Sequence, residues 1–226
     1  SALSGSSATM EPAVDPSATP EKLLKPMSDR MVWVMLAKPL LSEGFLKDSK
    51  ALLELAFRQA QVFDDEECQS QCRHVLAQIA FWQEDIHLAL KLELEAQDFN
   101  GDLELWCDSI AGYVDFLQYD GQHRACKRVI EGTLKTLDEI AGSRPSSAPD
   151  ARFNRGRFLH RKAQLLAGPR GPTGTAFGTP LLNRPPAEFE EAISLLQQAT
   201  IEMQQLGVDM STVAVYRDTA DLLQQK

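Results

Sequence analysis

The sequence predicts an all-α fold, an α-solenoid of stacked antiparallel helix pairs. Apolar residues recur at three- and four-residue spacing along most of the chain, which is the spacing of one face of a helix. No segment shows the sustained alternation with β-branched residues that is typical of a strand. An apolar residue followed by alanine and a second apolar residue also recurs, in segments 46–55, 86–96 and 189–199. Repeated helix pairs stack into solenoids, which usually present surfaces to partners.

The composition is that of an ordinary globular chain with an acidic balance. Its 226 residues, 43% apolar and 24% charged, are enough for one domain with a buried core. The net charge of -9 argues against nonspecific nucleic-acid binding. No apolar run approaches the roughly 20 residues that span a bilayer, and no signal peptide is visible. We therefore expect a cytoplasmic chain without a membrane contact. Its end inside a helix-like pattern suggests an excerpt of a longer protein.

The first residues predict an arm ahead of the helical domain. Residues 1–18 are rich in Ser, Ala, Pro and Thr and predict a disordered arm, whereas 19–226 predict the helical repeat domain. Thr19-Pro20-Glu21 is a typical helix start, with a capping hydroxyl and a proline in the first turn. A second helix is expected at 29–42, and Pro39 is expected to kink or shorten it.

The following helices are expected from apolar spacing and from polar turns between them. The expected ranges are 45–62, 65–82, 85–97, 102–118, 122–141 and 150–167. The Gly/Pro-rich stretch 168–186 then predicts a long insert. A helix from 186 to about 206 and a last helix complete about nine helices, which form four pairs and a lone final helix.

This pattern resembles the tetratricopeptide repeat, a family that pairs two helices in roughly 34 residues with small residues where the helices cross. The unit 70–103 matches best, whereas Gly112 and Tyr113 stand in reversed order of size in the next unit. The positions assigned by this resemblance are Ala51, Leu76, Ala77, Ala89, Ala96, Ala125, Phe189, Ala192 and Ala199. The resemblance implies a superhelix. A generic helical array, such as a HEAT-like one, remains the alternative.

The resemblance implies a non-enzymatic protein–protein interaction scaffold, a segment of a larger structural assembly. Large cytoskeletal or axonemal scaffolds contain similar divergent arrays, so we expect a cytoskeletal or ciliary location. Two alternatives stay open: a free-standing adaptor that recognises short peptide motifs, and a regulatory domain of a larger enzyme. Some family members bind acidic chaperone tails through Lys and Asn, but the matching positions here are Gln71, His74 and Gln78.

A basic segment is the sharpest chemical feature of the sequence. From Arg144 to Arg184 there are eight basic residues and one acid, Asp150. We expect protein partners, with an acidic surface or tail meeting this segment. The candidate partner-binding residues are Arg152, Arg155, Arg157, Arg161 and Lys162. The alternative is that these cations pair with the acidic remainder of the chain.

The remaining chemically versatile residues predict packing rather than catalysis. The four cysteines form no CxxC pair and predict buried, reduced thiols. The four histidines fall on separate predicted helices, so no nucleophile–base pair is indicated. We expect no enzyme activity, metal, cofactor or small-molecule substrate. Trp33, Trp82 and Trp106 are expected to fill gaps between helices.

Overall fold

The computed structural model describes residues 29–98, 101–167, 186–204 and 214–220, and all regular structure in these ranges is helical. The helices are α2 (Asp29–Ser42), α3 (Leu46–Val62), α4 (Glu66–Trp82), α5 (Ile86–Ala96), α6 (Leu103–Tyr119), α7 (His123–Ser143), α8 (Ala148–Ala167) and α9 (Pro186–Gln204), with the short 3-10 helix η1 (Pro145–Ser147) before α8. Residues 214–220 are also helical. The prediction of an all-α fold is confirmed. The expected arm, the helix start at Thr19 and nearly all of the Gly/Pro-rich insert lie outside the described residues.

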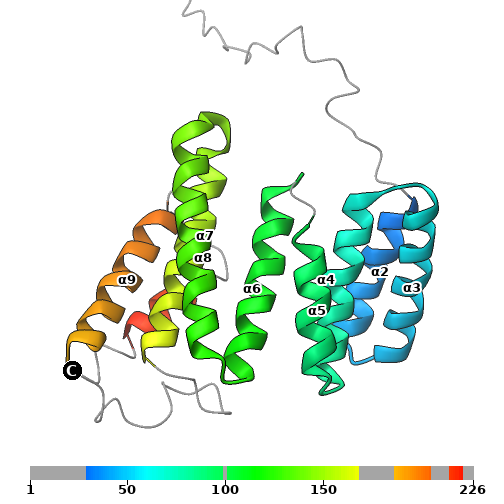
Figure 1. Cartoon of the computed structure of the whole chain (residues 1–226), viewed down its shortest axis with the longest axis horizontal. Helices are drawn as coiled ribbons and strands as arrows, with labels where there is room; N and C mark the ends of the chain where they lie inside the picture. The colour runs from blue at the N-terminus through cyan, green and yellow to red at the C-terminus, as the bar shows by residue number, and fades with distance from the viewer. Residues whose placement is uncertain (1–28, 99–100, 168–185, 205–213, 221–226) are drawn as a thin grey trace, which may run out of the picture.

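The helices pack on their neighbours in chain order (Figure 1). The pairs α2–α3, α4–α5, α6–α7 and α8–α9 are in contact, and each pair also contacts the next through α3–α4, α5–α6 and α7–α8. The first helices of successive pairs touch as well, α2 with α4, α4 with α6 and α6 with α8. The first helices therefore form a layer of their own across the described part of the molecule.

Four of the interhelix turns that the structure describes share one backbone conformation. Each places one residue at positive φ, between 53° and 85°, and these residues are Gly44, Asp64, Glu84 and Gly121. The next residue donates its N–H to a carbonyl five residues earlier, at 2.8–3.0 Å, as in Asp85 to Ala80. This bond satisfies a carbonyl that the ending helix leaves open. Asp65 and Asp85, which follow two of these turns, cap the next helix with their side chains, and Asp102 caps α6 in the same way.

Small buried residues set how closely the helices approach. Of the positions that the resemblance assigned to the repeat, Ala77, Ala89, Ala96, Ala192 and Ala199 are buried. Leu76, Phe189 and Ala125 are only half-buried. Ala51 is exposed, so it does not lie at a helix crossing. On α3 the inward face is formed instead by Ser49, Leu53, Ala56 and Ala60.

One proline and one glycine shape individual helices of the array. Pro39 lies inside α2 but does not shorten the helix, which continues to Ser42. Gly156 on α8 faces α9 so closely that an added Cβ would collide with the Met203 side chain and press on the Ala199 carbonyl. Gly156, together with Ala199, thus sets the close approach of α8 and α9.

Candidate partner-binding surface

A buried polar cluster joins α4, α5 and α6. His74 Nδ1 on α4 lies 3.0 Å from both carboxylate oxygens of Glu93 on α5, and Gln78 Nε2 lies 3.1 Å from His74 Nε2. His74 therefore contacts the Glu93 carboxylate through one ring nitrogen and the Gln78 amide through the other. The carboxylate lies over Gly112 of α6, where an added Cβ would collide with Oε1. Glu93 therefore links three consecutive helices.

Burial makes Glu93 an unusual acid. Its side chain is completely buried, and this burial raises its pKa from 4.5 to about 7. The bond and charge of His74 act in the opposite direction, whereas the negative charges of Asp115 and Asp108 on α6 raise the pKa further. Stability should consequently respond to pH near neutrality.

A second cluster of the same composition lies at the other end of the described chain. His160 Nε2 on α8 lies 2.7 Å from Asp218 Oδ2, and Gln164 Nε2 donates to the same oxygen at 2.9 Å. His160 and Gln164 are four residues apart, like His74 and Gln78, and Asp218 is fully buried like Glu93. In both places a first helix supplies His and Gln to a buried carboxylate from a later helix. Neither cluster can be recognised in the sequence, because each acid is distant along the chain from its His and Gln partners.

The basic residues of α8 reach back to α6. Arg157 Nη2 lies 2.6 Å from Asp108 Oδ1, and Arg161 binds Asp115 with two bonds of 3.2 and 3.1 Å. A planar guanidinium suits this paired geometry. These contacts bridge two first helices across the layer that they form.

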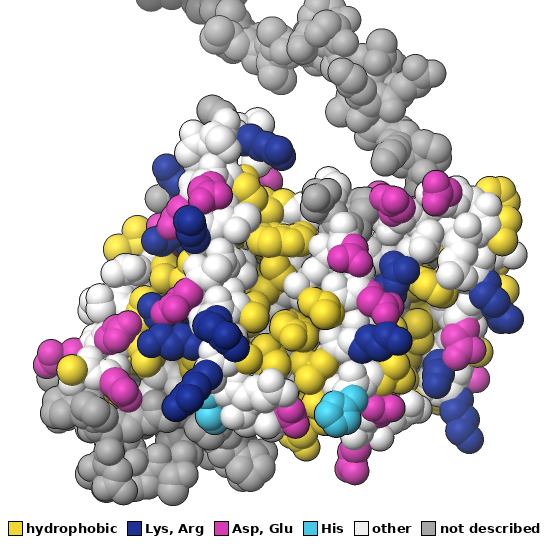
Figure 2. Space-filling model, viewed as in Figure 1, with side chains coloured by type: hydrophobic (Ala, Val, Ile, Leu, Met, Phe, Trp, Pro, Cys, Tyr) yellow, Lys and Arg dark blue, Asp and Glu magenta, His cyan; other side chains and the backbone are white. Residues whose placement is uncertain are grey.

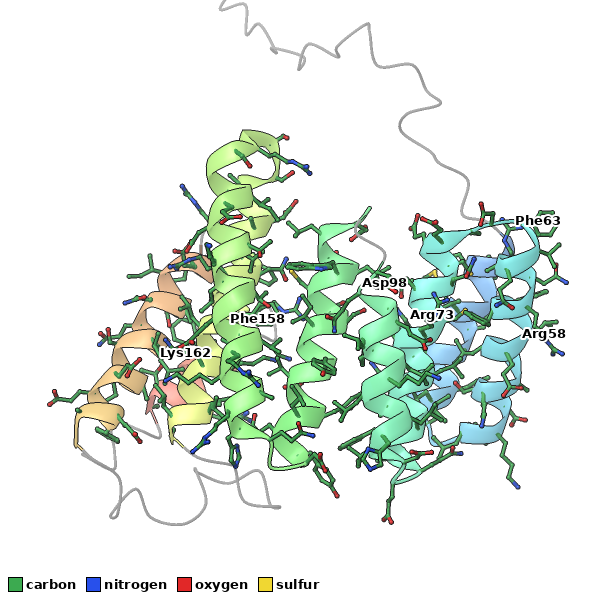
Figure 3. All side chains as sticks on the ribbon, viewed as in Figure 1. Arg58, Phe63, Arg73, Asp98, Phe158 and Lys162 are labelled. Carbon is green, nitrogen blue, oxygen red and sulfur yellow. The ribbon has the colours of Figure 1, made fainter. Side chains whose placement is uncertain are left out.

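Other cations of α8 reach its flanking second helices. The partners are Asp138 at 2.7 Å and Glu202 at 3.1 Å for Arg155, and Glu131 at 3.7 Å and Glu191 at 3.6 Å for Lys162. Lys162 is labelled in Figure 3, beside α9. The basic helix is thus held by carboxylates of α6, α7 and α9.

These contacts bear on the five candidate partner-binding residues. Arg155, Arg157, Arg161 and Lys162 are partly buried and make ion pairs within the chain, and Arg152 is exposed. The geometry supports the alternative that the acidic remainder of this chain neutralises the basic segment. Arg144 is exposed, whereas Arg170 and Arg184 lie outside the described residues.

In the first two helix pairs, two arginines stack on phenylalanine rings in addition to making ion pairs. Arg73 on α4 lies over the ring of Phe57, 5.0 Å from its centroid, and its Nε lies 3.6 Å from a Glu95 carboxylate oxygen (Figure 3). Arg30 similarly covers Phe63 and binds Asp65. Such contacts combine apolar burial with charge pairing, so they stabilise the pairs rather than leave charge for a partner.

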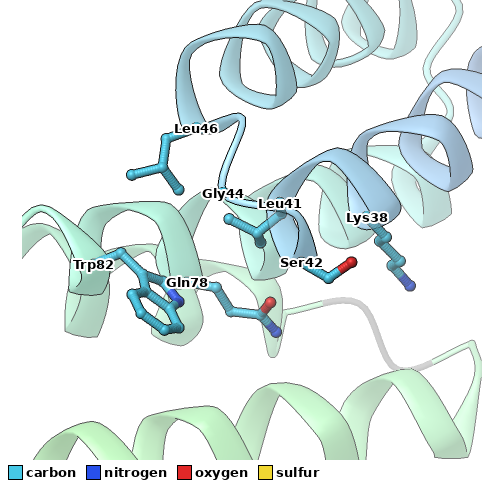
Figure 4. Close-up of a pocket in the computed structure, with 7 residues that line it drawn as sticks. All are labelled: Lys38, Leu41, Ser42, Gly44, Leu46, Gln78 and Trp82. Atoms are coloured by element: carbon cyan, nitrogen blue, oxygen red, sulfur yellow. The ribbon is translucent and has the colours of Figure 1, made fainter.

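Trp82 departs from the expectation that tryptophans fill gaps between helices. Trp33 and Trp106 are partly buried and pack against the core, but Trp82, the last residue of α4, is 70% exposed. It borders a hollow of about 390 Å³ whose other lining residues are Lys38, Leu41, Ser42, Gly44, Leu46 and Gln78 (Figure 4). The hollow lies where α2 ends, α3 begins and α4 ends. An exposed indole beside leucines is a common anchor for a partner.

A second hollow is more polar. It has a volume of about 480 Å³ and lies between the start of α6 and the start of α8, where its lining includes Asp102, Glu104, Asp150 and Arg157. Arg157 is already paired with Asp108. Acids therefore dominate this hollow.

The surface seen in Figure 2 mixes charges of both signs around a central group of hydrophobic side chains. Among the described residues, large exposed hydrophobics include Met35, Leu36, Val62 and Phe63 of the first pair. An unbroken basic face, as a nucleic-acid partner would favour, is not seen on this side.

The cysteines are buried free thiols, as expected. Burial raises the pKa of Cys107 to about 12 and that of Cys126 to about 11, which keeps both protonated near neutrality. Within the described ranges, no three His, Cys, Asp or Glu side chains are grouped as metal ligands. No helix in those ranges is long and apolar enough to cross a membrane.

The fold and the surface define an all-helical protein of packed helix neighbours with mixed charge outside. No family model matches the chain. The chain is similar to cilia- and flagella-associated protein 46 of Chlamydomonas reinhardtii, with 26% identity over 156 residues. The match covers 65% of this chain but only 6% of that protein.

Proposed function

We propose that this chain is a non-enzymatic protein–protein interaction scaffold, built as a tetratricopeptide-like array, within a structural assembly of the cilium. The observation that carries the binding role is the layer of first helices, in which α2, α4, α6 and α8 contact one another in succession. Pairs that repeat in this way bury a shared core and leave a long surface for partners.

The ciliary setting is supported by the similarity to cilia- and flagella-associated protein 46. Because the match spans 6% of that protein, it supports a segment of a large assembly and does not supply a partner. The proposed place is therefore the structural part of the cilium.

Arg155, Arg157, Arg161 and Lys162 act in this proposal as internal ties of the array. Each has a carboxylate of α6, α7 or α9 within 4 Å. A partner with an acidic tail would have to displace these carboxylates. The contact is better sought where side chains are exposed, as at Trp82.

A free-standing adaptor for short peptide motifs is the second candidate. The hollow beside Trp82 favours it, since its size suits a single large side chain. An adaptor would exchange freely between bound and dissolved states, whereas a scaffold would stay in its assembly.

This difference can be measured in cells. The tagged chain is expressed in a cell line before and after it grows motile cilia, and the cilia are then extracted with detergent. A scaffold remains with the axoneme after extraction. A chain that leaves with the detergent fraction, or that spreads equally through ciliated and non-ciliated cells, would contradict the ciliary scaffold. The Gly132→Ala variant adds a Cβ in open space, so it should be retained in the axoneme to the same extent as the native chain and serves as the control.

A further inference from the structure

We infer that the hollow beside Trp82 binds a short peptide segment that carries one large apolar side chain next to a carboxylate. This inference rests on the proposed binding function and names the chemistry of the partner. The hollow is built by three elements, since Lys38, Leu41 and Ser42 come from α2, Leu46 from α3 and Trp82 from α4.

The walls of the hollow are apolar. Leu41 and Leu46 are half-buried, and the Trp82 indole presents most of its surface to solvent (Figure 4). An aliphatic or aromatic side chain placed among these three would bury apolar surface on several sides, which favours binding. A volume of about 390 Å³ accommodates one such side chain with its neighbouring backbone.

The positive charge of Lys38 favours a carboxylate beside the apolar side chain of the peptide. Lys38 is the one charged group among the seven described lining residues, and none of the seven is an acid. Its Nζ donates at 3.3 Å to the amide oxygen of Gln71, a neutral group, and no carboxylate of the described residues lies within ion-pair distance. By contrast, Arg155, Arg157 and Arg161 each have a carboxylate in the chain. A partner carboxylate would therefore find an ammonium without internal competition.

The polar groups at the rim can accept or donate to the peptide backbone. Gln78 uses Nε2 for His74, which leaves its amide oxygen facing the hollow region (Figure 4). Because Gln78 is held through His74 to buried Glu93, its side chain is positioned in advance. Preorganised polar groups in an apolar hollow give orientation at little entropic cost.

The test uses the whole chain, labelled with ¹⁵N, and follows the indole N–H signal of Trp82. The Trp82→Phe variant identifies that signal among those of the three tryptophans. The probe is a pool of terminally blocked heptapeptides with Leu, Phe or Trp at the centre and Asp or Glu on both sides of it. One control pool replaces the acids by Lys, and another replaces the central residue by Ser.

The acidic apolar pool should shift the Trp82 signal in a saturable way, and the two control pools should not. Lys38→Gln should weaken the apparent affinity about fivefold, whereas Lys47→Gln, which alters an exposed cation outside the lining, should leave it unchanged. Added salt should weaken binding of the acidic pool.

Three results would overturn the inference: no shift with the acidic pool, an equal shift with the lysine pool, or no effect of Lys38→Gln. The proposed ciliary role fails separately. If the chain is retained in axonemes but does not respond to the peptides, only the inference of a peptide site is contradicted. If the chain responds to the peptides but is lost from axonemes on detergent extraction, only the proposal of a ciliary scaffold is contradicted.

Discussion

The carboxylate of Glu93 occupies the space over Gly112 in which any other residue would place its Cβ. The same carboxylate lies 3.0 Å from His74 Nδ1, so α4, α5 and α6 meet at one buried acid. Glycine at this position of α6 is therefore required by Glu93 of the preceding helix, α5. Substitutions at Gly112, Glu93 and His74 can each test this junction.

Gly112→Ala should lower the free energy of unfolding by about 1–3 kcal/mol, because the new methyl group forces the Glu93 carboxylate away from its place. The effect is measured by urea denaturation. Gly132→Ala, in open space on α7, is the matched control and should raise stability by up to about 1 kcal/mol, as expected for alanine in a helix. Equal changes in the two variants would show that Glu93 does not constrain α6.

The pH dependence of stability should carry the signature of Glu93. Its pKa in the folded protein, about 7, is raised above the usual value of 4.5, so the folded state binds more protons than the unfolded state between these values. The contribution is fully present below pH 4.5 and is lost as pH rises through 7. His74, Asp108 and Asp115 are the groups that act on this acid.

Glu93→Gln should remove this pH-dependent contribution to the free energy of unfolding. The difference in unfolding free energy between the native chain and the variant is expected to fall by about 1–3 kcal/mol from pH 5 to pH 8. Denaturant titrations of both proteins at several pH values give this difference directly. A difference that is constant with pH would contradict the raised pKa of Glu93 in the folded protein.

The ion pairs between α8 and α6 should be coupled energetically. In a double-mutant cycle, Arg157→Met and Asp108→Ala should show a coupling of about 1 kcal/mol, a modest value because both side chains are partly exposed. The coupling should shrink at high salt. The exposed pair Lys135–Glu139 is the reference, and its coupling should be smaller. Equal coupling energies in the two pairs would contradict the inference that the Arg157–Asp108 ion pair holds α8 against α6.

The shared interhelix turn predicts opposite effects at its two kinds of residue. Gly121 has φ 75° and Glu84 has φ 63°, a region that costs most residues about 1 kcal/mol. Gly121→Ala should therefore destabilise the chain by about this amount, and Glu84→Gly should stabilise it by a similar or smaller amount. Thermal unfolding of the two variants would show whether their melting temperatures move in opposite directions.

Helix positions were predictable because the apolar spacing is local. The observed bounds of the helices from α2 to α8 lie within two residues of those expected. The face of α3 was harder to assign, since buried Ser49 is polar. Its hydroxyl donates to the Ala37 carbonyl at 2.9 Å, so a serine occupies a place on the inward face that the pattern of apolar residues cannot reveal.

The candidate surface was predicted less well, because its contacts join distant segments. Arg157 and Asp108 are 49 residues apart, and His160 and Asp218 are 58 apart. The sequence shows a basic segment and an acidic remainder but not which charges meet. Trp82 was misassigned because its aromatic character suggests burial, whereas its place at the end of α4 leaves it at the surface.

The central claim, a helical scaffold inside a ciliary assembly, is tested most directly by crosslinking mass spectrometry on axonemes isolated from cells that carry the tagged chain. Exposed lysines such as Lys47 and Lys135 supply the crosslinking sites. A scaffold of the axoneme should give crosslinks to the same few axonemal proteins in every preparation. Crosslinks that stay within the chain, or that reach a different set of proteins each time, would contradict it.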